Sequence, residues 1–134
     1  METICIAEDN EIDQKILKLT IAKYFTFRNV FFFSDGNSLL NYLKENRMDM
    51  LNLPDLILID LNMPGLNGWD FLAAFNKIKY SFPKCIQVYI VSVSINPREI
   101  QKTREYEFVK DFISKPLSKE KLSAISGQEI LINR

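Results

Sequence analysis

Histidine is absent from the whole sequence of 134 residues. Its absence excludes Ser-His-Asp and Cys-His catalysis, zinc sites with histidine ligands, and a phosphohistidine on this chain. Cysteine is nearly as scarce, with only Cys5 and Cys85. Both have apolar neighbours in the sequence, so we expect reduced, structural thiols and no disulfide.

An excess of charge is also missing, because 17 Lys and Arg residues balance 17 Asp and Glu residues. This balance predicts neither a nucleic acid partner nor binding to an anionic membrane. No apolar run approaches the length of a membrane-spanning helix, and residues 1–3 do not resemble the basic start of a signal peptide. We therefore expect a cytoplasmic protein, with one domain over residues 1–134 and a short C-terminal tail over 127–134.

Patterns typical of a buried strand and of a helix alternate five times along the chain. Ile12, Ile16 and Leu19, with residues 23–25, form the apolar face of the first predicted helix. The alternation predicts an α/β fold with a parallel sheet and helices on both of its faces. We expect strands at 3–7, 29–33, 55–60, 86–91 and 111–114, and helices at 11–25, 37–46, 68–79, 97–106 and 118–126.

Polar side chains stand where several of these strands end. Glu8 and Asp9 follow the first strand, Asp60 ends the third, Ser92 follows the fourth, and Lys115 comes just after the fifth. In open parallel sheets, ligands bind at the carboxyl ends of the strands. With the strand order 2-1-3-4-5, all five side chains would meet at one edge of the sheet.

These residue types favour phosphoryl transfer. Three carboxylates packed together raise one another's pKa unless a cation neutralises them. Mg²⁺ binds such oxygens together with backbone carbonyls and water, and a lysine can pair with an anion or with Asp60. A carboxylate oxygen would then attack phosphorus to form an acyl phosphate. Each residue alone also fits an ordinary role at a helix start, a turn or a surface loop, and Ser94 is as good a turn hydroxyl as Ser92.

Four segments together resemble the receiver domain of two-component response regulators. They are Ala7-Glu8-Asp9-Asn10, the stretch DLNMPGLNG over 60–68, Val91-Ser92, and Ser114-Lys115-Pro116. The resemblance covers roughly residues 3–126. It implies a flavodoxin-like, doubly wound sheet of five parallel strands in the order 2-1-3-4-5.

The resemblance also implies a role for each matching residue. Asp60 would be the phosphoacceptor, and Ser92 and Lys115 would bind the phosphoryl group. Phe112 would be the aromatic switch residue, where the family often has tyrosine. Mg²⁺ (or Mn²⁺) would be held by Asp9, by Glu8 partly through water, by Asp60 and by the backbone carbonyl of Asn62.

The implied partners are other proteins. A sensor histidine kinase or a histidine phosphotransfer protein would supply the phosphoryl group, which fits the missing histidines. A downstream protein would bind the face made by the fourth helix, fifth strand and fifth helix, and no output domain is expected. Val93 stands where the family usually has a small residue, so Val93 and Asn62 are expected to tune the pocket, with Val93 narrowing the access of water.

Two other interpretations of the same residues remain. One is a receiver-like scaffold that works without phosphorylation, although the five site positions are intact. The other is a Mg²⁺-dependent aspartyl-phosphate hydrolase of the haloacid dehalogenase type. That family has its nucleophile near the N-terminus and a second acid where Asn62 stands, so we expect a signalling switch and not an enzyme. A flavin-binding domain is disfavoured, because Glu8 and Asp9 would repel the flavin phosphate.

Overall fold

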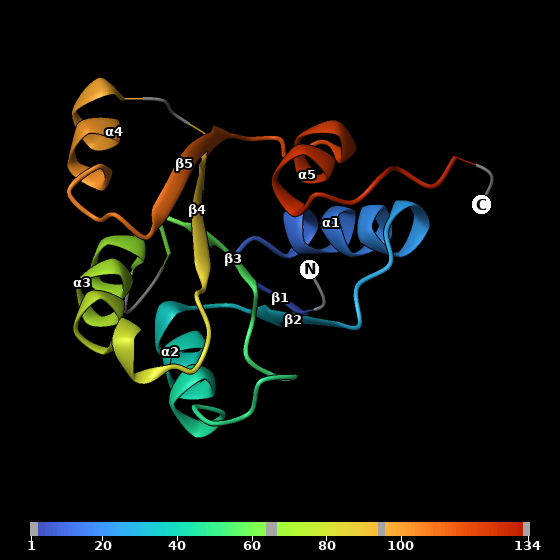
Figure 1. Cartoon of the computed structure of the whole chain (residues 1–134). Helices are drawn as coiled ribbons and strands as arrows, with labels where there is room; N and C mark the ends of the chain where they lie inside the picture. The colour runs from blue at the N-terminus through green and yellow to red at the C-terminus, as the bar shows by residue number, and fades with distance from the viewer. Residues whose placement is uncertain (1–2, 64–66, 94–95, 133–134) are drawn as a thin grey trace.

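The computed structural model describes residues 3–63, 67–93 and 96–132, and within them five parallel strands form one sheet (Figure 1). The strand order is β2-β1-β3-β4-β5, which confirms the predicted order. The strands are β1 (Thr3–Ala7), β2 (Asn29–Phe33), β3 (Leu56–Asp60), β4 (Gln87–Ser92) and β5 (Val109–Ser114).

Helices cover both faces of the sheet (Figure 1). Residues of α2 and α3 pack on one face, those of α1 and α5 pack on the other, and α4 contacts β5. Successive strand residues alternate between the two cores, as a strand's period of two requires. The helices are α1 (Glu11–Tyr24), α2 (Gly36–Glu45), α3 (Gly68–Ile78), α4 (Pro97–Thr103) and α5 (Lys119–Ser126).

Most predicted boundaries are within a residue of the observed ones, and the two larger differences flank one turn. Helix α4 ends at Thr103, because backbone N–H groups of Glu105 and Tyr106 donate three residues back and tighten the chain into a turn. Strand β5 starts at Val109, two residues before the prediction. The pairing of β5 with β4 changes register between Val88 and Tyr89. Because of this irregularity, the start of β5 has no regular alternation of apolar and polar residues in the sequence.

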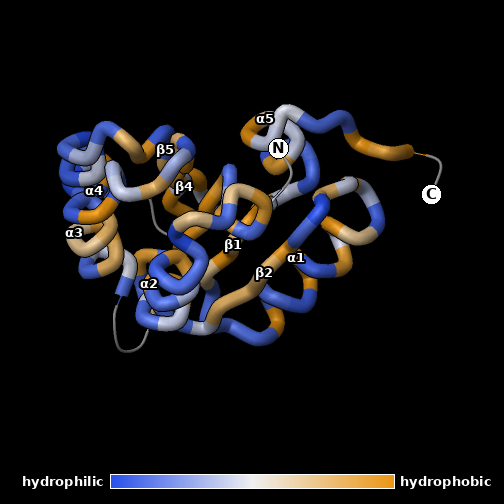
Figure 2. The backbone as a smooth tube through the Cα atoms, turned by 60° about the horizontal axis from the view of Figure 1, so that its bottom comes forward, coloured by the Kyte–Doolittle hydropathy of each residue, from blue (hydrophilic) through white to orange (hydrophobic). Residues whose placement is uncertain are grey.

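The apolar face predicted for the first helix is wrong for three of its members, although Phe25 at its end is buried as predicted. Ile12, Ile16 and Leu19 are 71%, 57% and 67% exposed, whereas Leu17 and Ile21 are buried against the sheet. Both sets recur at helical spacing, and Figure 2 shows hydrophobic positions returning along α1 between hydrophilic ones. The exposed set is called the α1 stripe below.

The two cysteines differ in their surroundings. Both are free thiols, as predicted. Cys5 is fully buried, and burial raises the pKa of its thiol. Cys85 is exposed, so the structural role predicted for it is wrong. Among the described helices, none combines the length and the apolar character needed to cross a membrane.

Gly68 brings the start of α3 into direct contact with the end of β3. Its N–H donates to the carbonyl of Leu61 at 3.1 Å. A Cβ atom at this position would lie 2.6 Å from the Cα of Leu61 and 2.7 Å from the carbonyl oxygen of Asp60. Only glycine fits without moving the backbone that carries Asp60.

Replacing Gly68 by alanine is therefore expected to destabilise the fold by about 1–3 kcal/mol, through overpacking against the backbone. Urea unfolding measures the loss. Gly127→Ala is the matched control, because Gly127 has φ +74° but a Cβ there would meet no other described atom within 4 Å. Its cost of about 1 kcal/mol would come from the left-handed conformation alone. A Gly68→Ala protein as stable as wild type would contradict the close approach.

Candidate functional site

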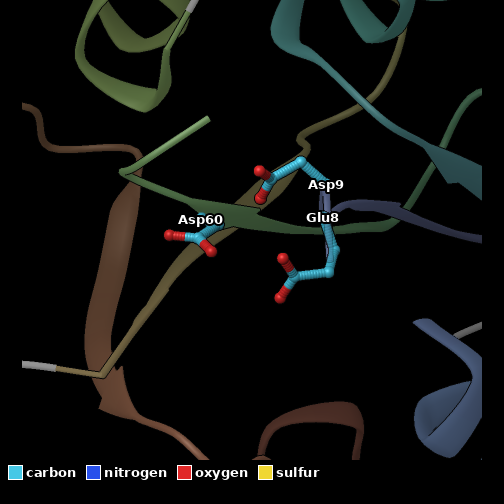
Figure 3. Close-up of side chains that lie close together, drawn as sticks. All are labelled: Glu8, Asp9 and Asp60. Atoms are coloured by element: carbon cyan, nitrogen blue, oxygen red, sulfur yellow. The ribbon is translucent and has the colours of Figure 1, made fainter. Parts of the chain in front are cut away.

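Three carboxylates meet at the carboxyl ends of β1 and β3. Glu8 and Asp9 directly follow β1, and Asp60 is the last residue of β3. The two strands are neighbours, with Ala7 level with Ile59, so the residues that follow them emerge side by side. Each side chain offers a carboxylate oxygen, and these oxygens lie within 4.8 Å of one another (Figure 3). Glu8 and Asp60 are buried, while Asp9 is exposed.

Lys115 neutralises part of this negative charge. Its Nζ atom donates to Oδ2 of Asp60 at 2.7 Å and to Oε1 of Glu8. The residue directly follows β5, and its backbone N–H donates to the carbonyl of Ser92 at 2.8 Å. The peptide bond between Lys115 and Pro116 is cis. The ammonium group is thus held between the two buried acids.

The pKa shifts follow from this arrangement. Burial raises the pKa of Glu8, although hydrogen bonds from Lys115 and from the N–H of Asn10 oppose the shift. Burial alone would lower the pKa of Lys115, but the carboxylates of Asp60 and Glu8 outweigh it and raise the pKa. Lys115 therefore remains charged at neutral pH.

Asp60 is held at both carboxylate oxygens. Oδ1 accepts from the backbone N–H of Asn62 at 2.9 Å, and Oδ2 accepts from Lys115. These bonds fix the orientation of the carboxylate at the rim of the sheet. The predicted role of the Asn62 carbonyl as a metal ligand stays a prediction.

Ser92 supplies a hydroxyl that is buried without a partner. It ends β4, one residue past the position level with Asp60, and has no exposed surface. Within the described part of the chain, its Oγ atom makes no hydrogen bond. Leaving such a group unpaired costs about 1–3 kcal/mol, so buried hydroxyls normally have a partner. An oxygen atom of a bound group would satisfy it.

A mostly apolar pocket of about 310 Å³ lies beside the acids. Its lining includes Glu8 and Lys115 from the acid cluster, Asp13 and Ile16 from α1, and Val93 after β4. Val93 is 75% exposed, and its predicted effect on water access stays a prediction. Phe112 lies on β5, partly buried against the core under α3. The pocket connects the acid cluster with the α1 stripe.

The structure thus brings together Glu8, Asp9, Asp60 and Lys115, with Ser92 on the next strand. It also adds Asp13, which sequence reasoning missed. The Oδ2 atom of Asp13 lies 3.4 Å from Nζ of Lys115. No local signal pointed to Asp13, because Lys115 lies 102 positions further along the chain and Asp9 precedes the N-cap of α1.

The donor set suits a hard divalent cation. Carboxylate oxygens are preferred ligands of Mg²⁺ and Mn²⁺, and the three acids lie close enough to share one ion. The burial that raises the pKa of Glu8 would be offset by such a positive charge. The residues present therefore fit a divalent metal.

Comparisons with known proteins agree with this geometry. Residues 4–126 match the family model described as the response regulator receiver domain. A curated relative, hybrid signal transduction histidine kinase I of Dictyostelium discoideum, is 26% identical over 129 residues. The match covers 96% of this chain but only 7% of that protein.

Two solved structures show the same fold. A two-component response regulator from Cytophaga hutchinsonii aligns with a TM-score of 0.81 and 26% identity, over 95% of each chain. The phosphorylated cyanobacterial phytochrome response regulator RcpA aligns with a TM-score of 0.74 and 26% identity, over 98% of this chain and 99% of that one. The flavodoxin-like fold predicted from the sequence is confirmed.

Proposed function

We propose that this chain, which belongs to the response regulator receiver domain family, accepts a phosphoryl group on Asp60 from a phosphohistidine of a partner protein. The observation that carries the proposal is the bond between Lys115 and Asp60 beside two further carboxylates. It provides an oriented carboxylate, a cation for the incoming phosphoryl oxygens and a set of metal ligands. Phosphoryl transfer depends mainly on such positioning and charge neutralisation.

In the proposed reaction, a carboxylate oxygen of Asp60 attacks phosphorus. The bond between phosphorus and the imidazole nitrogen breaks, its electron pair stays on that nitrogen, and an acyl phosphate forms on Asp60. Lys115 transfers its hydrogen bond from the Asp60 carboxylate to a phosphoryl oxygen. The Ser92 hydroxyl then donates to another phosphoryl oxygen and gains the partner it lacks.

Mg²⁺ (or Mn²⁺) is the proposed cofactor. Asp9, Glu8 and Asp60 would hold it with their carboxylates, and Asn62 with its backbone carbonyl. When bound, the ion neutralises negative charge on the acids and on the phosphoryl group. Support comes from the close approach of the three acids.

The direct test is the intact mass of the protein after incubation with acetyl phosphate and Mg²⁺. One added phosphoryl group is expected, and none when EDTA removes the metal. A histidine-phosphorylated phosphotransfer protein serves as a second donor. No addition from either donor would contradict the proposal and favour the phosphorylation-independent scaffold.

The partner that donates the group is proposed to be a sensor histidine kinase or a histidine phosphotransfer protein. A macromolecular donor must contact the surface around Asp60 to bring its histidine within reach. The α1 stripe provides an exposed apolar surface there, because Ile16 lines the same pocket as Glu8 and Lys115. Apolar residues exposed together in this way are typical of protein–protein contacts. We assign the stripe to the donor protein.

Replacing Leu19 in the stripe by asparagine is expected to slow transfer from a phosphotransfer protein about tenfold, as the loss of an apolar interface residue would. Leu19 does not line the pocket, so the rate with acetyl phosphate should stay within about twofold of wild type. Met48→Asn is the control, since Met48 is 77% exposed but lies in the segment between α2 and β3. Equal slowing with both donors would contradict the docking role.

The downstream protein is proposed to bind the face formed by α4, β5 and α5. Phe112 lies on β5, the strand of this face, and is only partly buried, so it can respond to the phosphoryl group. The strand order and the family match argue against the hydrolase alternative.

The cytoplasmic location, the absence of nucleic acid and membrane partners, and the single domain over 1–134 stay predictions.

A further inference from the structure

Asp13 contacts Lys115 but has no role in the proposed phosphoryl transfer. It lies in the first turn of α1, and its Oδ2 atom is 3.4 Å from Nζ of Lys115. The side chain is 45% exposed, and the residue lines the pocket beside Glu8 and Lys115. Asp13 therefore stands where the acid cluster opens to solvent.

The backbone of Asp13 is fixed in this position. Asn10 caps α1, and its side-chain oxygen accepts the N–H of Asp13 at 2.9 Å. A carboxylate in the first turn is also favoured by the helix dipole. The cap thus fixes the Asp13 backbone in the first turn of α1, from which its carboxylate reaches Lys115.

Lys115 is thereby shared among three acids from three parts of the fold. Glu8 follows β1, Asp60 ends β3, and Asp13 belongs to α1. Proposed phosphorylation replaces the single negative charge of Asp60 by the roughly double charge of a phosphoryl group. Lys115 favours that change, and Asp13 opposes it in two ways: it repels the added charge, and it competes for the ammonium group.

We propose that Asp13 is a positioning residue that limits phosphorylation of Asp60 by holding Lys115 toward α1 and by repelling anionic groups at the mouth of the site. The inference rests on the proposed function. The negative charge of Asp13 attracts Mg²⁺ and repels the phosphoryl group, so its removal affects the two in opposite directions. Removing its charge weakens the binding of Mg²⁺ and speeds the arrival of the phosphoryl group.

The test compares wild type with Asp13→Asn in two measurements. Phosphorylation by acetyl phosphate at saturating Mg²⁺, followed by intact mass, should become about two- to fivefold faster, the size expected for a partly exposed charge contact. Mg²⁺ affinity, measured by calorimetry without a phosphate donor, should fall by about the same factor. A merely structural role would worsen both, so the opposite signs are the diagnostic result.

Two further variants act as controls. Glu11→Gln removes an acid from the same helical turn, with no bond to Lys115, and should leave both measurements close to wild type. Asp13→Glu keeps the charge and should restore both. This inference alone is overturned if wild type is phosphorylated normally and Asp13→Asn has the same phosphorylation rate and Mg²⁺ affinity as wild type. It is also overturned if Asp13→Asn is phosphorylated more slowly and binds Mg²⁺ more weakly. If wild type accepts no phosphoryl group, the proposed function falls and takes the inference with it.

Discussion

Replacing Asp60 by asparagine is expected to abolish phosphoryl incorporation. The amide has nearly the shape of the carboxylate, so it can keep the backbone bond from Asn62, but it has no anionic oxygen to attack phosphorus. The mass of the variant should stay unchanged after incubation with acetyl phosphate and Mg²⁺, under conditions that modify wild type. A loss of at least about 100-fold in rate is expected for removing the attacking group.

Asp111→Asn is the matched control for this experiment. Asp111 is an exposed acid on β5, and the same substitution there leaves the acid cluster intact. This variant should take up one phosphoryl group at the wild-type rate. Phosphorylation of Asp60→Asn at a similar rate would mean that another group is the acceptor, and peptide mapping would locate it.

Replacing Lys115 by methionine is expected to destabilise the metal-free protein by about 3 kcal/mol. Breaking a buried ion pair by removing one partner costs roughly this much, because the other charge stays buried. Here two carboxylates are left together, with the side chains of Glu8 and Asp60 only 8% and 10% exposed. Urea unfolding in EDTA measures the loss, and adding Mg²⁺ should recover part of it through binding to the folded state.

Lys79→Met is the matched control. It shows how much stability is lost when a lysine is removed whose acidic partner is exposed. The side chain of Lys79 is 16% exposed, close to the 13% of Lys115, but its partner Glu107 is 76% exposed. A surface pair of this kind contributes about 1 kcal/mol or less. Equal losses in the two lysine variants would contradict the role assigned to the buried acids.

Acidification should reduce the cost of Lys115→Met. Burial raises the pKa of Glu8, and the hydrogen bond from Lys115 opposes this rise in wild type. Without the lysine, Glu8 in the folded variant holds its proton at a higher pH than in the unfolded chain. Its stability relative to wild type therefore increases as the pH falls below neutral, and decreases again as the pH rises.

The sheet and most of the site followed from local sequence patterns. Short apolar runs ending in acids marked where β1 and β3 stop, and parallel neighbours bring such ends together. The buried face of α1 could not be predicted, because the α1 stripe and the pair Leu17 and Ile21 both recur at helical spacing. Periodicity gives the spacing of a face, whereas tertiary contacts decide which face packs on the sheet.

Contacts between distant residues escaped prediction for the same reason. Asp13 reaches Lys115 across 102 positions of the chain, and no local pattern encodes that distance. Cys85 has apolar Ile86 beside it, but it lies in the irregular segment before β4 and is exposed. Residue type and sequence neighbours were sufficient to predict the strands. They were insufficient to predict the surroundings of side chains that contact distant parts of the sequence.

The contact between Gly68 and the end of β3 makes the two sides of the site mechanically unequal. With no side chain between them, the backbone of β3 and the start of α3 touch directly, and close-packed groups transmit displacement with little loss. The opposite side, toward α1, has free volume in the pocket beside Glu8 and Lys115. A displacement of the backbone at Asp60 therefore moves α3 directly, while side chains on the side facing α1 can shift into the free volume of the pocket.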